Sequence, residues 1–349
     1  MPFARFAVRG SRFAIRGHAI HRGGIVAVLL ASGAFLDAEG PKLIHQQRYA
    51  MGTMFDIVAY HPSRADGERA IARAMDEIVR LDQVLSHYKR DSDLARLLRE
   101  GPETFVTVDP SLFDVLRESQ LVSRASGGTF DVTIGPIVKA WRTAHDERRL
   151  PSASVLAAAA RCVGYEKIAL EPPDRVKLQS DCLDIDLGGI GKGYAVDRAI
   201  AILAGAGIHA ALVNAGGSSI AAIGAPPNER GWPVELRAPV SGRRVLLLEG
   251  RSISTSQQHL ASAAIDGETF GEIIDPRSHA PTTSRVVVSV VAPTATISDA
   301  LDTALVMMSI PAGMQMLAEF PGVSAIWVSP TGQLEAAYRG SDLQLADSH

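Results

Sequence analysis

The chain has 349 residues, enough for a large core in one domain or in two closely packed subdomains. Its formal net charge of −3 and the lack of a block of basic residues argue against a nucleic acid as the main partner. Hydrophobic residues make up 46% and charged residues 21%, which are ordinary values for a globular protein.

The N-terminus has a different character from the rest of the chain. Residues 1–22 hold five arginines and no acid, and residues 23–34 form an apolar stretch that is short for a membrane span. This pattern is typical of a secretory signal, so residues 1–40 are predicted to be an export signal or a disordered N-terminus. The predicted location is the periplasm or the periplasmic face of the inner membrane. Cleavage of the segment and its retention as an anchor both remain open.

Residues 41–342 are predicted to form one domain in which helices and antiparallel strands mix without regular alternation, which favours the α+β class. Apolar residues recur at helical spacing, or alternate as in strands, in most of it. Helices are predicted over 64–85, just after 91–92, and over 110–126, 152–162, 194–203 and 298–310. Strands are predicted around 55–60, 166–185, 209–214, 219–223, 232–236, 244–249, 286–292, 325–329 and 334–338. Residues 143–155 are predicted to be an exposed polar excursion.

Two cysteines, Cys162 and Cys182, are the whole complement. They could form a disulfide if oxidised, but two free buried thiols are an equal alternative. Their spacing does not match a zinc site.

The most informative segment is a run of glycines that follows a short apolar strand at 183–187. The glycines allow close approach of a ligand to the backbone, and the next residues are predicted to begin a helix, whose N-terminus favours an anion. Lys192 adds a positive charge. The run matches neither a P-loop nor a dinucleotide fingerprint, and a tight turn with a surface lysine is the alternative. The glycines are Gly188, Gly189, Gly191 and Gly193.

Asp299 and Thr303 are four residues apart in a predicted helix, so their oxygens share one face. A carboxylate with a hydroxyl suits Mg²⁺, which binds one or two carboxylates together with phosphate and water. The alternative is capping of the helix by Thr296-x-x-Asp299, with Thr303 bonded back to the backbone.

Seven short motifs occur in an order and spacing that resemble the ApbE family of FAD:protein FMN transferases. The resemblance covers residues 46–338, and the seven motifs together are far more specific than any one of them. The motifs are Met51-Gly-Thr53, Ser86-x-Tyr88-x-x-Asp91-Ser92, Gly127-Gly-Thr-Phe-Asp-Val-Thr133 with Gly135-Pro136, Asp186-Leu-Gly-Gly-Ile-Gly-Lys-Gly-Tyr-Ala195, Asn214-Ala-Gly-Gly217, Ile273-Ile-Asp-Pro-Arg277 and Asp299-Ala-Leu-x-Thr303.

The resemblance implies an ApbE-like, T-fold-related α+β domain of two intimate subdomains that uses FAD as substrate with Mg²⁺. FMN would pass from FAD to a Ser or Thr hydroxyl of an acceptor flavoprotein subunit, and AMP would leave. Asp299, Thr303 and the carbonyl of Gly191 would hold the metal, and Lys192 would stabilise charge during the displacement. The implied FAD-binding residues are Met51, Tyr88, Asp131, Gly188, Gly189, Gly191, Lys192, Asp197, Asn214, Gly216, Gly217 and Asp275.

Several of these residues have structural alternatives. Met51 and Tyr88 would pack on flavin or adenine rings, or serve as ordinary core residues. Asp131, with Thr133, would touch the cofactor or fix its own loop. Asp197 would bind a nucleotide hydroxyl or orient the first turn of a helix.

The chain departs from the family pattern on the expected acceptor side. Glu272 replaces the histidine that commonly precedes Ile-Ile-Asp-Pro and is the candidate catalytic base, a weak one unless its surroundings raise its pKa. His259 or His279 could supply an imidazole instead. Two alternative functions therefore stand beside transfer: hydrolysis of FAD to FMN and AMP, and FAD binding without turnover.

Overall fold

The computed structural model describes residues 40–102, 104–240, 243–258, 260–265, 268–341 and 343–345. Of the predicted N-terminal segment 1–40, only Gly40 lies within the described residues, and the predicted domain end at 342 lies outside them. The helices are α1 Arg64–Leu85, α2 Asp93–Glu100, α3 Pro110–Ala125, α4 Gly135–Glu147, α5 Ala153–Ala160, α6 Gly191–Gly205, α7 Ala295–Val306 and α8 Ile310–Leu317, with a 3-10 turn at Tyr165–Lys167.

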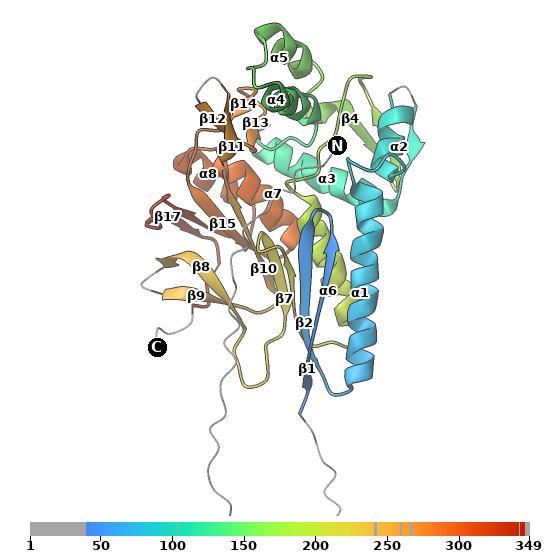
Figure 1. The fold of residues 1–349 in the computed structure, drawn as a ribbon. Helices are drawn as coiled ribbons and strands as arrows, with labels where there is room; N and C mark the ends of the chain where they lie inside the picture. The colour runs from blue at the N-terminus through green and yellow to red at the C-terminus, as the bar shows by residue number, and fades with distance from the viewer. Residues whose placement is uncertain are drawn as a thin grey trace, which may run out of the picture.

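An eight-stranded antiparallel sheet forms the centre of the molecule, in the order β1-β2-β6-β7-β10-β15-β16-β17 (Figure 1). Its strands are β1 Lys42–Ala50, β2 Thr53–His61, β6 Ala210–Ala215, β7 Ser219–Ile223, β10 Arg251–Gln257, β15 Val287–Ala292, β16 Ser324–Val328 and β17 Leu334–Arg339. All six residues of β15 are buried, as expected for a β-branched central strand.

Both faces of this sheet are covered, by different elements. Helices α1, α6 and α7 pack on one face and bury the larger hydrophobic cluster between themselves and the strands. Helix α1 begins at the Ser63 cap and buries one apolar stripe, including Ile71, Ile78 and Leu81. The other face carries the hairpin of β8 (Trp232–Val240) and β9 (Arg243–Leu248), which closes a second, smaller cluster.

The remaining elements gather at one end of the sheet, where Figure 1 shows α4, α5 and the small hairpins above α7 and β15. They include the sheet β3-β5-β4 and the hairpins β11–β12 and β13–β14. Their strands are β3 Val106–Thr107, β4 Ile168–Glu171, β5 Arg175–Leu178, β11 Leu260–Ile265, β12 Glu268–Gly271, β13 Ile274–Asp275 and β14 Ala280–Pro281. The predicted α+β class is therefore confirmed, with a sheet-and-helix part and an end part packed closely together.

Some predicted boundaries were wrong. The polar stretch 143–155 was predicted as an excursion, but α4 continues through its first half to Glu147. The predicted helix 298–310 begins earlier, at the Thr294 cap, and is followed by the separate helix α8. Within the part of the chain that the structure describes, no helix has both the length and the apolar character needed to cross a bilayer.

The two cysteines form a disulfide. Cys162 follows α5 and Cys182 precedes the glycine run, and their Cα atoms are 5.4 Å apart. Of the two alternatives for these residues, the structure therefore contains the bridge. It joins α5 to the segment that leads into the glycine run.

Candidate functional site

The glycine run turns the chain from an extended segment into α6. The predicted strand 183–187 is not a regular strand, because within it only Asp184 forms a β-bridge, which is to Ile134. The amide of Asp186 donates to the Val132 carbonyl. The Asp186 carboxylate then accepts the Gly188 amide at 2.8 Å. Helix α6 begins without a side-chain cap from its own N-cap residue, Ile190. The Gly191 amide donates to the Leu187 carbonyl at 2.8 Å, whereas the Gly193 amide takes its partner from elsewhere.

Asp299 of α7 is that partner. Its Oδ2 accepts the Gly193 amide at 2.8 Å, and its carboxylate is almost fully buried. A negative charge at a helix N-terminus is stabilised by the helix dipole. The acid that was predicted from sequence to hold a metal thus lies directly on the glycine run.

Thr303 lies one turn further along α7, on the same face. A Cβ placed on Gly189 would be 3.1 Å from the Thr303 Oγ1, and one placed on Gly193 would be only 2.2 Å from the Ala295 carbonyl oxygen. The glycines are therefore needed for the close approach of the run to α7. The Thr303 hydroxyl also donates to the Asp299 carbonyl at 3.1 Å, which is the back-bonding alternative named above.

Two residues of this region were not singled out from the sequence. Asp302 is 1% exposed and lies between Asp299 and Thr303 on α7. Ser254 of β10 is fully buried, and its hydroxyl lies 3.3 Å from the Asp299 Oδ1. Burial, and then the charge of Asp299, raise the pKa of the Asp302 carboxyl well above its usual range. The i, i+3 spacing of the two acids was the available signal for Asp302.

Lys192 and Gly191 occupy the first turn of α6. The Lys192 ammonium donates to the Gly188 carbonyl at 3.1 Å, so it lies across the glycine run. A Cβ on Gly191 would lie 3.5 Å from the Met51 methyl group, which places Met51 against the same turn. Met51 has φ 48° at the β1–β2 hairpin, followed by Gly52 at φ 75°.

Asn214, Gly216 and Gly217 form the β6–β7 turn beside this hairpin. The Asn214 side chain accepts the Gly217 amide at 2.7 Å, and both glycines have positive φ. The Gly216 amide donates to the Met54 carbonyl. These predicted cofactor residues and Met51 are therefore neighbours in the structure.

Tyr88 is 76% exposed, so the core-packing alternative for it is wrong. The guanidinium of Arg142 lies 5.5 Å from the centre of its ring and donates to its hydroxyl at 3.2 Å. The neighbouring His87 holds its Nδ1 3.0 Å from the Ile185 carbonyl oxygen. This contact joins the Tyr88 loop to the segment just before the glycine run.

Asp131 holds its own loop and the 3-10 turn at Tyr165–Lys167 in place. Its oxygens accept from the Thr133 amide and hydroxyl and from the Tyr165 amide. Burial raises the pKa of this carboxyl. These contacts support the structural alternative given for Asp131, and the cofactor contact stays a prediction.

Asp197 also makes structural contacts. Its carboxylate accepts the amides of Ala295 and Thr296 and the Thr296 hydroxyl, which fixes the first turn of α7. Burial raises its pKa. These three donors support the helix-orienting alternative for Asp197, and the nucleotide contact stays a prediction.

Asp275 is paired with Arg277, and its predicted cofactor contact stays a prediction. Both of its oxygens accept from the Arg277 side chain, at 3.0 and 2.7 Å. Burial raises the pKa of Asp275, but these hydrogen bonds outweigh burial and leave the pKa below its usual value. Arg277 also donates to the Met307 carbonyl, so the pair ties the β13–β14 hairpin to the end of α7.

Glu272 lies between β12 and β13 and is exposed. Among the residues that the structure describes, its side chain has no hydrogen-bond or ion-pair partner, so its carboxylate is accessible to a substrate. His279 lies on the adjacent hairpin with φ 59°, and its carbonyl accepts from the Trp141 ring nitrogen. His259 lies outside the described residues.

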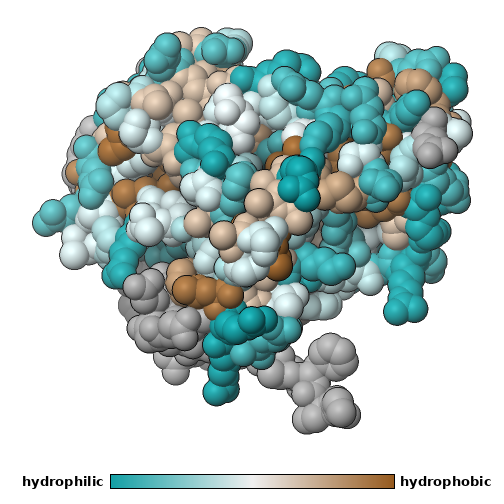
Figure 2. All heavy atoms as spheres, turned by 90° about the horizontal axis from the view of Figure 1, so that it is seen from above, coloured by the Kyte–Doolittle hydropathy of each residue, from teal (hydrophilic) through white to brown (hydrophobic). Residues whose placement is uncertain are grey.

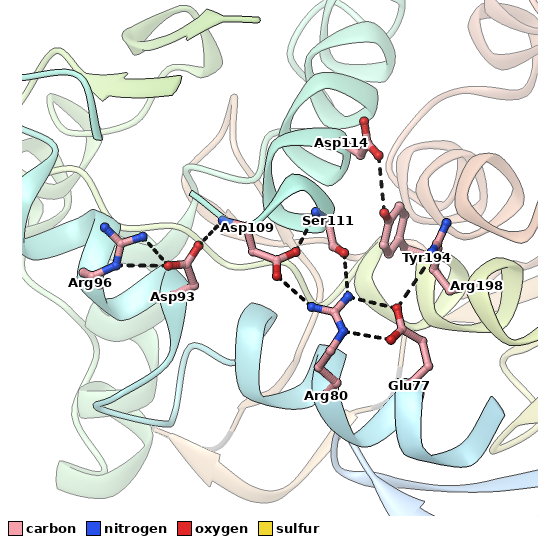
Figure 3. A network of polar contacts seen from close by, with 9 residues as sticks. All are labelled: Glu77, Arg80, Asp93, Arg96, Asp109, Ser111, Asp114, Tyr194 and Arg198. Carbon is pink, nitrogen blue, oxygen red and sulfur yellow. Dashed lines mark hydrogen bonds and ion pairs between the residues drawn. The ribbon is translucent and has the colours of Figure 1, made fainter. Parts of the chain in front are cut away.

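A polar network anchors α6 to α1 and α3 (Figure 3). Arg80 of α1 binds Glu77 through two hydrogen bonds of 2.8 and 2.9 Å, and reaches Asp109 and Ser111 at the start of α3. Glu77 in turn lies 3.7 Å from the guanidinium of Arg198 on α6. The network fixes the helix that carries Lys192.

The end of the molecule above the sheet is mostly hydrophilic, with small separate hydrophobic areas (Figure 2). A surface cavity of about 320 Å³ lies there between α4 and α5, lined in part by Lys139, Glu147, Leu150 and Val155. None of the residues predicted for the site lines it. The geometry therefore favours the glycine run and α7, rather than this cavity, as the candidate site.

Among the described residues, no group of three or more His, Cys, Asp or Glu side chains is placed to hold a metal. The region around α7 instead combines two buried acids with a hydroxyl, Thr303, and a cradle of backbone at the glycine run. Oxygen donors of this kind fit Mg²⁺, which keeps water and phosphate among its ligands.

The comparisons with known proteins all indicate the same family. A model of the ApbE family matches residues 51–327. The FAD:protein FMN transferase of Treponema pallidum is 28% identical over 338 residues, which cover 90% of this chain and 92% of that protein. The protein of the same name from Klebsiella pneumoniae is 28% identical over 293 residues, or 81% and 83% of the two chains. The apo flavinyl transferase ApbE of Pseudomonas stutzeri shares the fold, with a TM-score of 0.73 at 23% identity over 87% of this chain and 98% of that one.

Proposed function

The chain belongs to the ApbE family, and we propose that it is an FAD:protein FMN transferase. It moves FMN from FAD to a Ser or Thr hydroxyl of an acceptor flavoprotein subunit, releases AMP and depends on Mg²⁺. The observation that carries this proposal is the contact between Asp299 and the Gly193 amide. It puts a buried acid, a helix N-terminus and Lys192 at one turn of backbone, where a diphosphate and a cation fit together.

In the proposed reaction, the acceptor hydroxyl oxygen forms a bond to the phosphorus of the FMN half. The bond from that phosphorus to the bridging oxygen breaks, and AMP leaves with this oxygen. Lys192, held over the glycine run by Gly188, stabilises negative charge on the phosphates. The exposed Glu272 accepts the hydroxyl proton.

Asp299, Thr303 and the Gly191 carbonyl would hold Mg²⁺, which supplies Lewis-acid neutralisation of phosphate charge when bound. Met51 and the exposed Tyr88 provide apolar and aromatic surface for the rings of FAD. The β6–β7 turn at Asn214, Gly216 and Gly217 offers backbone close to the nucleotide.

The proposal is tested by mass spectrometry of a candidate acceptor domain after incubation with the protein, FAD and Mg²⁺. We expect an added mass equal to FMN, together with AMP. Asp299→Asn should lower the rate of labelling by about 100-fold or more, because it removes charge stabilisation in the transition state. Asn can still accept the Gly193 amide, so the fold should survive. Asp76→Asn, an exposed residue on α1 that pairs with Arg48, is the charge-matched control and should label normally.

Two results would contradict transfer. Release of AMP and FMN with an unlabelled acceptor would identify a hydrolase. Intact FAD that stays bound with no AMP formed would identify a binding protein without turnover.

The role of Glu272 has its own test. Glu272→Gln removes the proton acceptor but keeps the shape of the side chain, so the labelling rate should fall about 100-fold. FAD affinity, measured by fluorescence titration, should be unchanged because Glu272 is not placed among the FAD contacts. Full activity of this variant would assign proton removal to another group.

We also propose that the protein is exported and works in the periplasm or at the periplasmic face of the inner membrane. The basic and apolar N-terminal sequence supports this location. The disulfide between Cys162 and Cys182 supports it independently, because such bonds persist in oxidising compartments. Cell fractionation, with the N-terminus of the mature protein identified by mass spectrometry, separates cleavage from anchoring and would place a cytoplasmic protein elsewhere.

A further inference from the structure

Asp302 is a buried acid to which the proposed reaction gives no role. It is 1% exposed, follows Asp299 by three residues and directly precedes Thr303. Residues three and four apart on a helix share one face, so Asp299 lies beside both Asp302 and Thr303. The Thr303 hydroxyl lies 3.2 Å from the Asp302 Oδ1, so the three oxygen-bearing side chains are neighbours on α7. Burying a carboxylate without a compensating group is costly.

Hydrogen bonds within the described residues satisfy the two acids only in part. Asp299 accepts from the Gly193 amide at 2.8 Å and from the Ser254 hydroxyl at 3.3 Å, and Asp302 accepts from the Thr303 hydroxyl at 3.2 Å and interacts with the same Ser254 hydroxyl. Each hydroxyl has a single proton. The Ser254 hydroxyl is closer to the Ser218 carbonyl, at 2.8 Å, and the Thr303 hydroxyl also faces the Asp299 carbonyl, at 3.1 Å. Only the Gly193 amide is committed to a carboxylate without a competitor.

Side-chain cations do not compensate the acids either. In the described part of the chain, the ion pairs include neither Asp299 nor Asp302. Lys192 acts on Asp302 from a distance, while its ammonium is bonded to Gly188. Two acids with few donors and no contacting ammonium or guanidinium group form an environment that favours a divalent cation.

We propose that Asp302 supplies a second carboxylate to the divalent-cation site, so that the ion contacts two acids of α7 as well as Thr303. This inference rests on the proposed metal dependence of the transferase. The second acid strengthens binding of the cation before FAD arrives, because more of the ion's charge is balanced by the protein itself.

The test is a titration of the purified, chelator-treated protein with Mn²⁺ in the absence of FAD, followed by electron paramagnetic resonance of the free ion. Asp302→Asn should weaken Mn²⁺ binding by about 10- to 100-fold. Asp299→Asn should abolish it, and the exposed Asp76→Asn should leave it unchanged. Mg²⁺ should displace Mn²⁺ from the unaltered protein.

Thermal unfolding separates this role from a structural one. Without metal, Asp302→Asn should unfold at the same temperature as the unaltered chain or higher, because it removes a buried charge. The rise in Tm that Mn²⁺ produces should shrink. A structural hydrogen-bonding role predicts instead a lower Tm and unchanged Mn²⁺ affinity. Asp302→Ser, which also removes the charge and is smaller, replaces Asp302→Asn if the latter fails to fold.

The outcomes keep the two proposals apart. Normal Mn²⁺ affinity in Asp302→Asn, with binding lost in Asp299→Asn, overturns the role of Asp302 and leaves the transferase proposal standing. No Mn²⁺ binding by the unaltered protein overturns the role of Asp302, and FMN labelling in metal-free buffer would then overturn the proposed metal dependence as well.

Discussion

Gly193 and Gly205 lie on the same helix, α6, but only Gly193 has no room for a methyl group. A Cβ on Gly193 would lie 2.2 Å from the Ala295 carbonyl oxygen and 2.8 Å from the Cβ of Asp299. Backbone cannot move aside as a flexible side chain can, so α6 and α7 would have to separate. Gly205 has nothing within 4 Å of the same position.

Gly193→Ala is therefore expected to lower the free energy of unfolding by about 1–3 kcal/mol, the usual range for overpacking. Gly205→Ala should be neutral or stabilising by up to about 1 kcal/mol, because alanine favours helix. Urea denaturation of both variants measures the difference. Equal stability of the two would show that α6 and α7 are less tightly joined than the structure indicates.

At the residue scale, the sequence identified residue types suited to the proposed chemistry, but it did not show which groups each side chain contacts. Asp299 and Lys192 were found because an acid, a lysine and glycines have distinctive spacing, and the structure brings them together. For Asp197 and Asp131 the sequence left a cofactor contact and a structural role open, and the structure shows which backbone amides their carboxylates accept. A sequence does not reveal which amides lack a partner within their own helix or loop, and those amides decide where a carboxylate binds.

At the element scale, Glu77 on α1 holds α6 through Arg198 and α3 through Arg80. Hydrogen bonding from Arg80 lowers the pKa of Glu77 below its usual value of 4.5. A carboxyl with a lowered pKa in the folded state stabilises the fold above its unfolded pKa. That contribution disappears as the pH falls through the folded-state pKa.

We therefore expect Glu77→Gln to reduce stability at pH 7 and to remove part of the loss of stability seen on acidification below about pH 4.5. The free energy of unfolding, measured by urea titration from pH 7 to pH 3, gives both effects. Glu68→Gln is the control, because Glu68 lies on the same helix in an exposed pair with Arg64. A parallel pH dependence of Glu77→Gln and the unaltered chain would contradict the assigned role.

Long periodic elements could be predicted from the sequence, whereas short ones could not. Helix α1 was predicted with its observed bounds because 22 residues carry one apolar stripe and a serine cap. The hairpins β11–β12 and β13–β14 were missed, since their strands of two to six residues contain too few alternations to stand out. Their position is set by packing against α4, through Trp141 and Phe270.

At the scale of the whole molecule, the disulfide joins α5 to the segment before the glycine run, 20 residues further along the chain. Closing a loop of this length is expected to stabilise the fold by about 3 kcal/mol in the chain-entropy model. The double variant Cys162→Ser, Cys182→Ser should lose this amount in guanidinium denaturation.

The oxidised protein treated with a reductant should approach the same value. Addition of reductant to the double variant is the control and should have no effect on its stability. Equal stability of the reduced and oxidised forms would show that the disulfide does not stabilise the fold.

The order of the strands in the central sheet could not be derived from the sequence. Strand β10 pairs with β7 and β15, so residues 219–223, 251–257 and 287–292 lie side by side. Local patterns locate strands, but they do not specify partners that are 30 residues or more apart. The class of fold follows from the mixture of elements, whereas the order of these strands depends on contacts between distant segments, such as those of α7 with β10 and β15.

One carboxylate in this molecule serves two helices. Asp299 belongs to α7 and closes the first turn of α6, which is also the turn that carries Lys192. A cation bound to the Asp299 oxygens withdraws electron density from them and therefore weakens the hydrogen bond that they accept from the Gly193 amide. Binding of a cation at Asp299 would thereby affect the junction of the two helices, and hydrogen–deuterium exchange of the Gly193 amide would report it.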